Sequence, residues 1–201
     1  MQVIADQLCK RYLYDWIIKD LSRNFESESV TGVSGINGSG KSTLMKMLSG
    51  WLSPSKGSVM YRHQQETVST ADVHKYVSIV APYTDLIQEY DLEEMYHFHT
   101  GFRELPSISD FAHFEEVVKL KGHKGKSLQY YSSGMKQRVQ LALATLSESP
   151  LLLLDEPTSY LDAENKAWFY QLLADHISGK TVIISSNDEE DFQLCSDVLY
   201  L

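Results

Sequence analysis

Nine consecutive residues, Gly35–Thr43, have the types and the spacing to bind phosphate, because they fit the pattern G-x-x-x-x-G-K-[S/T]. Glycine at 35, 38 and 40 is expected to adopt backbone angles that side chains forbid, so that successive N–H groups point at phosphate oxygens. The Lys41 ammonium would neutralise the β- and γ-phosphates, the Ser42 hydroxyl would bind Mg²⁺, and Thr43 would be a further donor. The predicted phosphate-binding residues are Gly35, Asn37, Gly38, Ser39, Gly40, Lys41, Ser42 and Thr43.

Two carboxylates, Asp155 and Glu156, follow a run of four leucines, Leu151–Leu154. Four leucines in a row predict a strand that is buried on both faces. In a parallel sheet, ligands bind beyond the carboxyl ends of the strands, where the phosphate loop is also expected. Asp155 is therefore predicted to orient Mg²⁺ or its waters, and Glu156 to polarise the water that attacks the γ-phosphate.

The elements that must position these residues alternate between strands and helices. Ser29–Ser34 is β-branched and leads into the glycine-rich loop, while Ser42–Leu52 has the apolar spacing of a buried helix. Further strands are predicted at Val3–Ala5, at residues 16–18, at Val59–Tyr61, at Val77–Val80 and at Lys180–Ser185. Helices are predicted at Val139–Leu146 and at Ala163–Ile177, where Ala167, Trp168, Leu172 and Leu173 would share a face. This alternation predicts an α/β fold with a mostly parallel sheet.

The middle of the chain, about residues 83–135, is rich in aromatic residues, histidine and charge, and glycine and proline interrupt its helical pattern. Asp91 and Glu94 have the spacing of a capping box at the start of a helix. The histidines at 97, 99 and 113 are expected at the surface or in a coupling region and not at a metal. We predict that this segment is a small helical insertion.

Composition excludes several other classes. The chain has 201 residues, 43% of them hydrophobic, and a formal net charge of −9, which disfavours a nucleic-acid partner. The two cysteines, Cys9 and Cys195, do not make a disulfide framework and match no zinc pattern. No signal peptide and no membrane span are predicted, which favours a cytoplasmic protein.

Together these motifs resemble the ATP-binding subunit of an ABC transporter over nearly the whole chain. Residues Tyr131–Arg138 resemble the signature LSGGQ followed by Q-Q-R, with Ser132 and Gly134 retained but Tyr, Ser and Met at the other three signature positions. Ser-Ser-Gly alone would favour an ordinary helix N-cap, whereas its place between the helical insertion and the acidic strand favours the signature. Residues 159–162 resemble the D-loop S-x-L-D of the family, and Tyr12 lies where the family stacks an aromatic on adenine, with Tyr14 and Trp16 as rivals.

Two positions depart from the family pattern. Pro82 falls where the family has a glutamine that binds Mg²⁺, and proline has no side-chain donor or acceptor; Gln88 or a water could substitute. Asn187 falls at the position of the switch histidine; asparagine can hydrogen-bond a γ-phosphate but cannot take up a proton or carry a positive charge near neutral pH. We therefore predict slow hydrolysis.

The resemblance implies a single P-loop NTPase domain over residues 1–201, with an N-terminal antiparallel β part, a core at 1–82 and 136–201 and a helical subdomain at about 83–135. It implies ATP and Mg²⁺ as cofactors, with Glu156 and Asn187 catalytic, Ser42 and Asp155 at the metal, and Ser132, Ser133 and Gly134 binding ATP in trans. The implied function is to power transport through a separate membrane permease as a homodimer or heterodimer, peripheral at the inner face of the cell membrane. The alternatives are a non-transport assembly ATPase and a slowly hydrolysing regulatory sensor.

Overall fold

The computed structural model describes residues 1–201 and divides them into two compact units. The first unit comprises Met1–Ala81, Ser149–Pro157 and Ile177–Leu201 and contains every strand; the second comprises Pro82–Glu148 and Thr158–His176. Residues 136–148 and 158–176, which the sequence prediction assigned to the core, thus group with the helical unit. The prediction of one domain with a helical subdomain at 83–135 stays a prediction.

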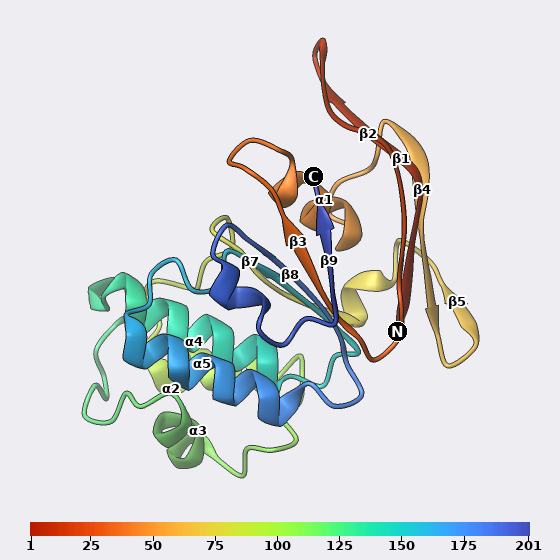
Figure 1. Ribbon diagram of the computed structural model, residues 1–201. Coiled ribbons are helices and arrows are strands. Elements are labelled where there is room, and N and C mark those ends of the chain that lie inside the picture. Colours follow the sequence, from red (N-terminus) through yellow and green to blue (C-terminus); the bar gives the residue numbers. More distant parts are fainter. The chain divides into compact units, whose positions relative to one another are not determined.

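A five-stranded sheet forms the centre of the first unit, in the order β6-β7-β8-β3-β9 (Figure 1). Every pair in it is parallel, which confirms the predicted parallel core. Its strands are β3 (Val30–Ser34), β6 (Val77–Val80), β7 (Leu151–Asp155), β8 (Thr181–Ser186) and β9 (Asp197–Tyr200). All four leucines of β7 are fully buried, as their continuous run predicts for a central strand.

A second sheet is antiparallel, in the order β2-β1-β4-β5, and confirms the predicted N-terminal β part. Its strands are β1 (Gln2–Tyr12), β2 (Asp15–Phe25), β4 (Lys56–His63) and β5 (Glu66–Val68). The first two are much longer than the short patches that the sequence indicated. Toward the hairpin turn, both strands consist mainly of exposed or partly exposed residues and have no continuous apolar run. Pairing between the two strands, and not hydrophobicity, therefore extends them.

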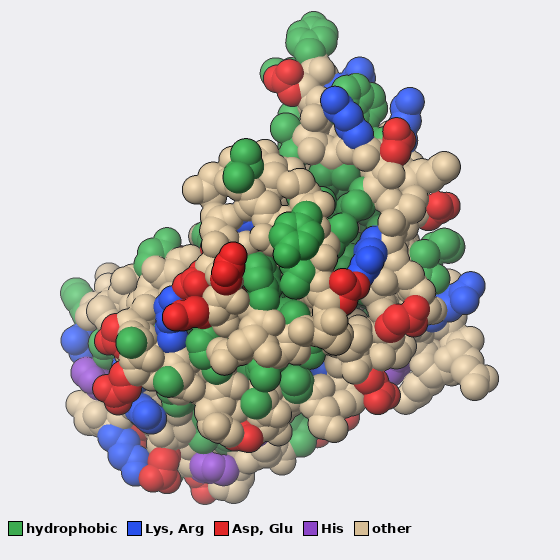
Figure 2. Space-filling model, viewed as in Figure 1, with side chains coloured by type: hydrophobic (Ala, Val, Ile, Leu, Met, Phe, Trp, Pro, Cys, Tyr) green, Lys and Arg blue, Asp and Glu red, His purple; other side chains and the backbone are tan.

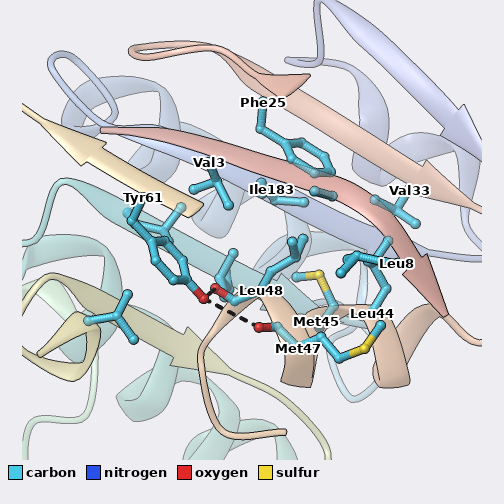
Figure 3. Packing of buried hydrophobic residues seen from close by; sticks show 14 of the residues in the cluster. Val3, Leu8, Phe25, Val33, Leu44, Met45, Met47, Leu48, Tyr61 and Ile183 are labelled. Carbon is cyan, nitrogen blue, oxygen red and sulfur yellow. Dashed lines mark hydrogen bonds between the residues drawn. The ribbon is translucent and has the colours of Figure 1, made fainter. Parts of the chain in front are cut away.

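Helix α1 (Lys41–Leu48) packs against β1, β7 and β8 and supplies the middle of the core. Its buried side chains Leu44, Met45 and Leu48 meet residues of both sheets (Figure 3). The Tyr61 hydroxyl donates to the carbonyl oxygens of Met47 and Leu48 at 3.3 and 3.1 Å, which satisfies it inside the core. Two short 3₁₀ turns, η1 (Val73–Lys75) and η3 (Glu189–Phe192), complete the unit.

The predicted extent of this helix to Leu52 was wrong. The helix ends at Leu48, Gly50 turns the chain with a φ of +78°, and the Trp51 side chain is 63% exposed. The helical spacing of apolar residues continues to Leu52, but the left-handed turn at Gly50 ends the helix before that point.

The second unit contains α2 (Leu92–Thr100), α3 (Phe111–Val117), η2 (Leu128–Tyr130), α4 (Ser133–Leu146) and α5 (Ala163–His176). The predicted capping box is confirmed: Asp91 accepts from the Glu94 N–H, and Glu94 accepts from the Asp91 N–H, both at 2.9 Å. The predicted face of α5 was wrong in part, because Ala167 is exposed whereas Phe169 is buried. No helix is long and apolar enough to cross a membrane.

One predicted surface histidine lies inside the second unit. His99 is half-buried, and its Nε2 lies 2.8 Å from the Ser147 hydroxyl. Burial first, and then the nearby Arg103 guanidinium, lower the pKa of His99 to about 4. His97, by contrast, is exposed as expected.

Candidate nucleotide-binding site

The loop between β3 and α1 has the backbone that the glycine pattern predicts, with one correction. Gly38 and Gly40 have φ angles of +86° and +108°, which favour glycine. Gly35 does not adopt a positive φ and is needed for space instead. A side chain there would meet the Ser39 hydroxyl at 2.5 Å and the Leu201 carbonyl oxygen at 3.0 Å.

Helix α1 begins without a side-chain cap, because its N-cap residue is Gly40. The Leu44 N–H donates to the Gly40 carbonyl at 2.8 Å as the first helical bond. The N–H groups of the preceding turn have no intrahelical acceptor, and the positive end of the helix dipole lies at the same place. The start of α1 therefore presents donors to an anion.

Lys41 is the most constrained side chain of the loop. It is 6% exposed, and its ammonium donates to the Gly35 carbonyl at 2.8 Å and to Asn187 Oδ1 at 2.6 Å. Glu156 Oε1 lies 3.5 Å from the same ammonium. The structure thus brings the predicted lysine and the two predicted catalytic residues to one point.

The carboxylate of Asp155 is fully buried at the end of β7. Its Oδ1 accepts a hydrogen bond from Ser185, whose strand position lies opposite Asp155 in the β7–β8 pair. Its Oδ2 is buried and has no hydrogen-bond partner. A buried carboxylate oxygen without a donor is costly, and a cation is the partner that would satisfy it.

Glu156 turns the chain sharply away from β7. Its φ is +51°, which is unusual for a residue with a side chain and costs of order 1 kcal/mol or more. The Glu156 N–H donates to the Ser185 carbonyl at 2.8 Å and fixes this conformation. The turn places the side chain, 23% exposed, beside Lys41 and not along the strand direction.

A cavity of about 360 Å³ lies over the loop. Its walls include most of the predicted phosphate-binding residues, and also Tyr12 and Glu156. The full lining is Tyr12, Ile17, Asn37, Gly38, Gly40, Lys41, Ser42, Thr43 and Glu156. Gly35 and Ser39 do not line the cavity, and the Ser39 hydroxyl lies close to Gly35. The cavity therefore brings six of the eight predicted loop residues together with Tyr12 and Glu156, and their role in binding stays a prediction.

Of the three aromatic candidates for the base, only Tyr12 lines this cavity. Tyr14 lies at the turn of the β1–β2 hairpin and is 92% exposed, where Figure 2 shows hydrophobic and basic side chains together. Trp16 makes two cation–π contacts instead: the Arg11 guanidinium and the Lys56 ammonium lie 5.2 and 5.6 Å from its ring centroid. The Lys10 ammonium lies 5.4 Å from the Tyr12 ring.

The predicted signature residues lie at the start of α4 in the second unit. Ser132 caps the helix by accepting from the Met135 N–H at 3.2 Å, which matches the local interpretation of Ser-Ser-Gly. Gly134 is close to the Tyr160 carbonyl, which a side chain at 134 would meet at 3.0 Å. Tyr131, at the leucine position of the signature, is buried in the helical core.

Gln88, the predicted substitute for the missing glutamine, has both ends of its side chain engaged within the second unit. Its Oε1 accepts from Lys136 at 2.6 Å, and its Nε2 donates to Asp85 at 2.5 Å. Pro82 follows β6 after one residue. A role for Gln88 at a metal would use Oε1, which would have to leave the Lys136 ammonium because the two cations repel each other.

Two residues of the site were missed from the sequence. Ile17 lines the cavity next to Gly40, and Ser185 donates a hydrogen bond to Asp155. A signal existed for Ser185, because a polar residue at the end of an otherwise apolar strand requires a buried partner. No signal existed for Ile17, since its closeness to Gly40 joins residues far apart in the chain.

Several known proteins are similar to this chain. The family model described as ABC transporter matches residues 18–159. An uncharacterized ABC transporter ATP-binding protein, YybJ of Bacillus subtilis, is 30% identical over 95% of this chain and 88% of its own length. The Nod factor export ATP-binding protein I of Rhizobium johnstonii is 30% identical over 91% of this chain, which spans 60% of that relative. The chain spans only 7–22% of the A-family ABC transporters that it matches.

Solved structures show the same fold. The dimeric structure of MJ0796, a bacterial ABC transporter cassette, superposes with a TM-score of 0.83 over 99% of this chain and 94% of its own, at 21% identity. A putative ABC transporter ATP-binding protein from Pyrococcus furiosus gives a TM-score of 0.79 at 23% identity over 100% and 98% of the two chains. With the cassette fold and the matching family model, this chain belongs to the ABC transporter ATP-binding family.

Proposed function

We propose that the chain binds Mg²⁺–ATP on the loop Gly35–Thr43 and hydrolyses it slowly, as the ATP-binding subunit of an ABC transporter. The observation that carries the proposal is the position of Lys41. A buried ammonium at the start of a helix, beside Glu156 and under a cavity, suits a triphosphate, which can accept from the ammonium and from the free N–H groups together. The base would lie against Tyr12, which shares the cavity.

The residues at the end of β7 fit a magnesium ion. The buried, unpartnered Asp155 Oδ2 and the Ser42 side chain at the cavity wall supply oxygen donors, which Mg²⁺ prefers. The ion would neutralise charge on the β- and γ-phosphates. Ser185 would hold the other carboxylate oxygen and so keep Asp155 in one orientation.

The chemistry that these residues can perform is positioning and charge stabilisation. Glu156, held by its turn next to Lys41, would accept hydrogen bonds from a water in line with the γ-phosphate. Asn187 could donate its amide to the γ-phosphate but could not carry a positive charge at neutral pH. A missing charge at the developing anion raises the barrier, which supports slow turnover.

The partners in this proposal are a second cassette and a membrane permease. Two chains would hold each ATP between the loop of one and Ser132, Ser133 and Gly134 of the other, at the N-terminus of α4. The dimer would close when the γ-phosphate is present and open after hydrolysis. The MJ0796 cassette is dimeric, and relatives are transporter ATP-binding proteins, which supports this arrangement for a protein peripheral to the inner face of the membrane.

Turnover by the purified protein tests the proposal. We expect Mg²⁺-dependent release of phosphate from ATP that is slow in the wild type, slower in Asn187→Ala and absent in Glu156→Gln. A rate unaffected by Glu156→Gln would refute the catalytic assignment. Asn24→Ala is a matched control, because it removes the same side chain from the exposed surface of β2, where its amide donates a hydrogen bond to Glu26.

A regulatory ATP sensor is the second candidate, and the contact of Asn187 with Lys41 favours it. Asn187 accepts a hydrogen bond from Lys41 at the position where the family has a histidine that can be cationic. A neutral residue there is compatible with ATP binding but favours slow hydrolysis. The two candidates differ in one assay: a sensor binds ATP and dimerises with no turnover above the Glu156→Gln background. Co-purification with a multi-span membrane protein would support the transporter role over a non-transport assembly ATPase.

A further inference from the structure

Two asparagine side chains from different elements meet above the phosphate loop. Asn37 lies in the loop after β3, and Asn187 lies directly after β8. Asn187 Nδ2 donates to Asn37 Oδ1 at 2.6 Å, and Asn187 Oδ1 accepts from the Lys41 ammonium, also at 2.6 Å. We call the chain Asn37–Asn187–Lys41 the carboxamide bridge.

The direction of the bridge follows from its lysine. An ammonium has donors and no acceptor, so the Asn187 atom that faces Lys41 must be the amide oxygen. The amide NH₂ then faces Asn37, whose Oδ1 is the acceptor that it meets. Asn37 supplies that acceptor, and a reversed Asn187 would regain a hydrogen bond to it only if the Asn37 carboxamide turned as well. Asn37 therefore stabilises the orientation in which the oxygen of Asn187 points to the lysine.

That orientation opposes a γ-phosphate. Phosphate oxygens are acceptors, as is the amide oxygen of Asn187, and both would compete for the same ammonium. To donate to a γ-phosphate, Asn187 must turn its NH₂ away from Asn37 and break that hydrogen bond. The β-phosphate of ADP also reaches Lys41, but ADP has no γ-phosphate for the Asn187 amide to meet, so only a triphosphate gains a contact from this rotation.

The backbone that carries Asn187 is fixed, so a change at Asn187 has to be a side-chain rotation. The preceding Ser186 is fully buried and donates to Asp191 at 2.5 Å. The following Asp188 N–H donates to the Ser186 hydroxyl at 3.0 Å. With both neighbours anchored, the exposed carboxamide is the part of this segment that can turn.

We propose that Asn37 is a positioning residue that acts through Asn187: it holds the Asn187 carboxamide toward Lys41 and thereby reduces the preference of the site for a triphosphate over a diphosphate. This inference rests on the proposed ATP-binding function of the loop. Removing Asn37 leaves Asn187 free to turn toward the γ-phosphate. Removing Asn187 deletes both the competitor and the γ-phosphate contact.

The test is a double-variant cycle read as a ratio of affinities. Equilibrium binding of fluorescent ADP and of AMP-PNP, with Mg²⁺, is measured for the wild type, Asn37→Ala, Asn187→Ala and the double variant. Asn37→Ala should raise the AMP-PNP to ADP affinity ratio roughly threefold to tenfold, the equivalent of one neutral hydrogen bond. Asn187→Ala should lower the ratio, and the double variant should match Asn187→Ala.

The ratio of affinities distinguishes an effect of Asn37 on Asn187 from general structural support of the loop. If Asn37 only supports the loop, its removal weakens both nucleotides equally and leaves the ratio unchanged, which overturns the inference. A shift of the ratio by Asn37→Ala in the Asn187→Ala background would also overturn it, because Asn37 would then act on the nucleotide directly. Wild-type protein that binds neither nucleotide would instead refute the proposed function, and Asn24→Ala should behave as wild type throughout.

Discussion

The hydrogen bond between Ser185 and Asp155 allows a prediction whose size follows from the structure. Asp155 is fully buried, its Oδ1 accepts from Ser185, and its Oδ2 has no hydrogen-bond partner. Ser185→Ala would leave a buried carboxylate without that donor. Hydrogen bonds to charged groups contribute about 1.5–3 kcal/mol, so we expect the free energy of unfolding to fall by roughly 2 kcal/mol in the absence of nucleotide.

A double-mutant cycle in urea isolates that interaction from other effects of the substitutions. Ser185→Ala, Asp155→Ala and the double variant are unfolded at pH 7, and the coupling energy should be about 1.5–3 kcal/mol. Ser149→Ala is the matched control, because Ser149 is a buried serine whose hydroxyl has no hydrogen-bond partner. That control should change stability by less than about 0.5 kcal/mol or increase it. The reasoning would be refuted if the stability losses of the two single variants sum to that of the double variant within about 0.5 kcal/mol.

Three further predictions concern other parts of the chain. His99 is neutral when folded because burial and then Arg103 lower its pKa to about 4, so its stabilising effect is complete above about pH 6.5 and is lost as the pH falls toward 4. In the wild type the free energy of unfolding in urea should fall by up to roughly 3 kcal/mol over that pH range, and in His99→Gln this fall should be smaller. The same pH dependence in both proteins would contradict the assignment. Gly57→Ala should lower the free energy of unfolding by more than about 3 kcal/mol, because the added side chain would overlap the backbone of Gln7. Gly122 has a similar φ but open space around it, so Gly122→Ala should lower it by only about 1–2 kcal/mol. Equal melting temperatures for the two variants would contradict this prediction. Tyr12→Ala should weaken ATP binding about tenfold and Tyr14→Ala should not, with a reversed order excluding Tyr12 as the stacking residue.

The sequence predicted the parts of the site that depend on local backbone chemistry. The phosphate loop, the start of α1 and the buried strand β7 are each specified by residues within a few positions, and all three are present in the structure. The capping box of α2 was likewise predictable, because both of its hydrogen bonds lie within four residues. Local rules therefore place Lys41 and Asp155 on the correct elements.

The contacts that join these elements were not predictable from the pattern. The bonds of Lys41 to Asn187 and of Asp155 to Ser185 link residues far apart in the chain, and they depend on the strand order that places β8 between β7 and β3. The length of β1 and β2 was missed for the same reason, since pairing between strands and not composition sets it. The positive φ of Glu156 also has no sequence signal, because glutamate rarely adopts it.

Direct binding of Mg²⁺–ATP, measured by titration calorimetry with wild-type protein and with Lys41→Ala, tests the central claim most directly. Lys41 donates to a carbonyl and an amide oxygen at the start of α1, in the cavity proposed for the phosphates. We predict saturable binding to the wild type at one site per chain, weakened at least about tenfold in a Lys41→Ala protein that retains its fold by circular dichroism. Wild-type protein that does not bind ATP, or equal affinity in the Lys41→Ala variant, would contradict the account.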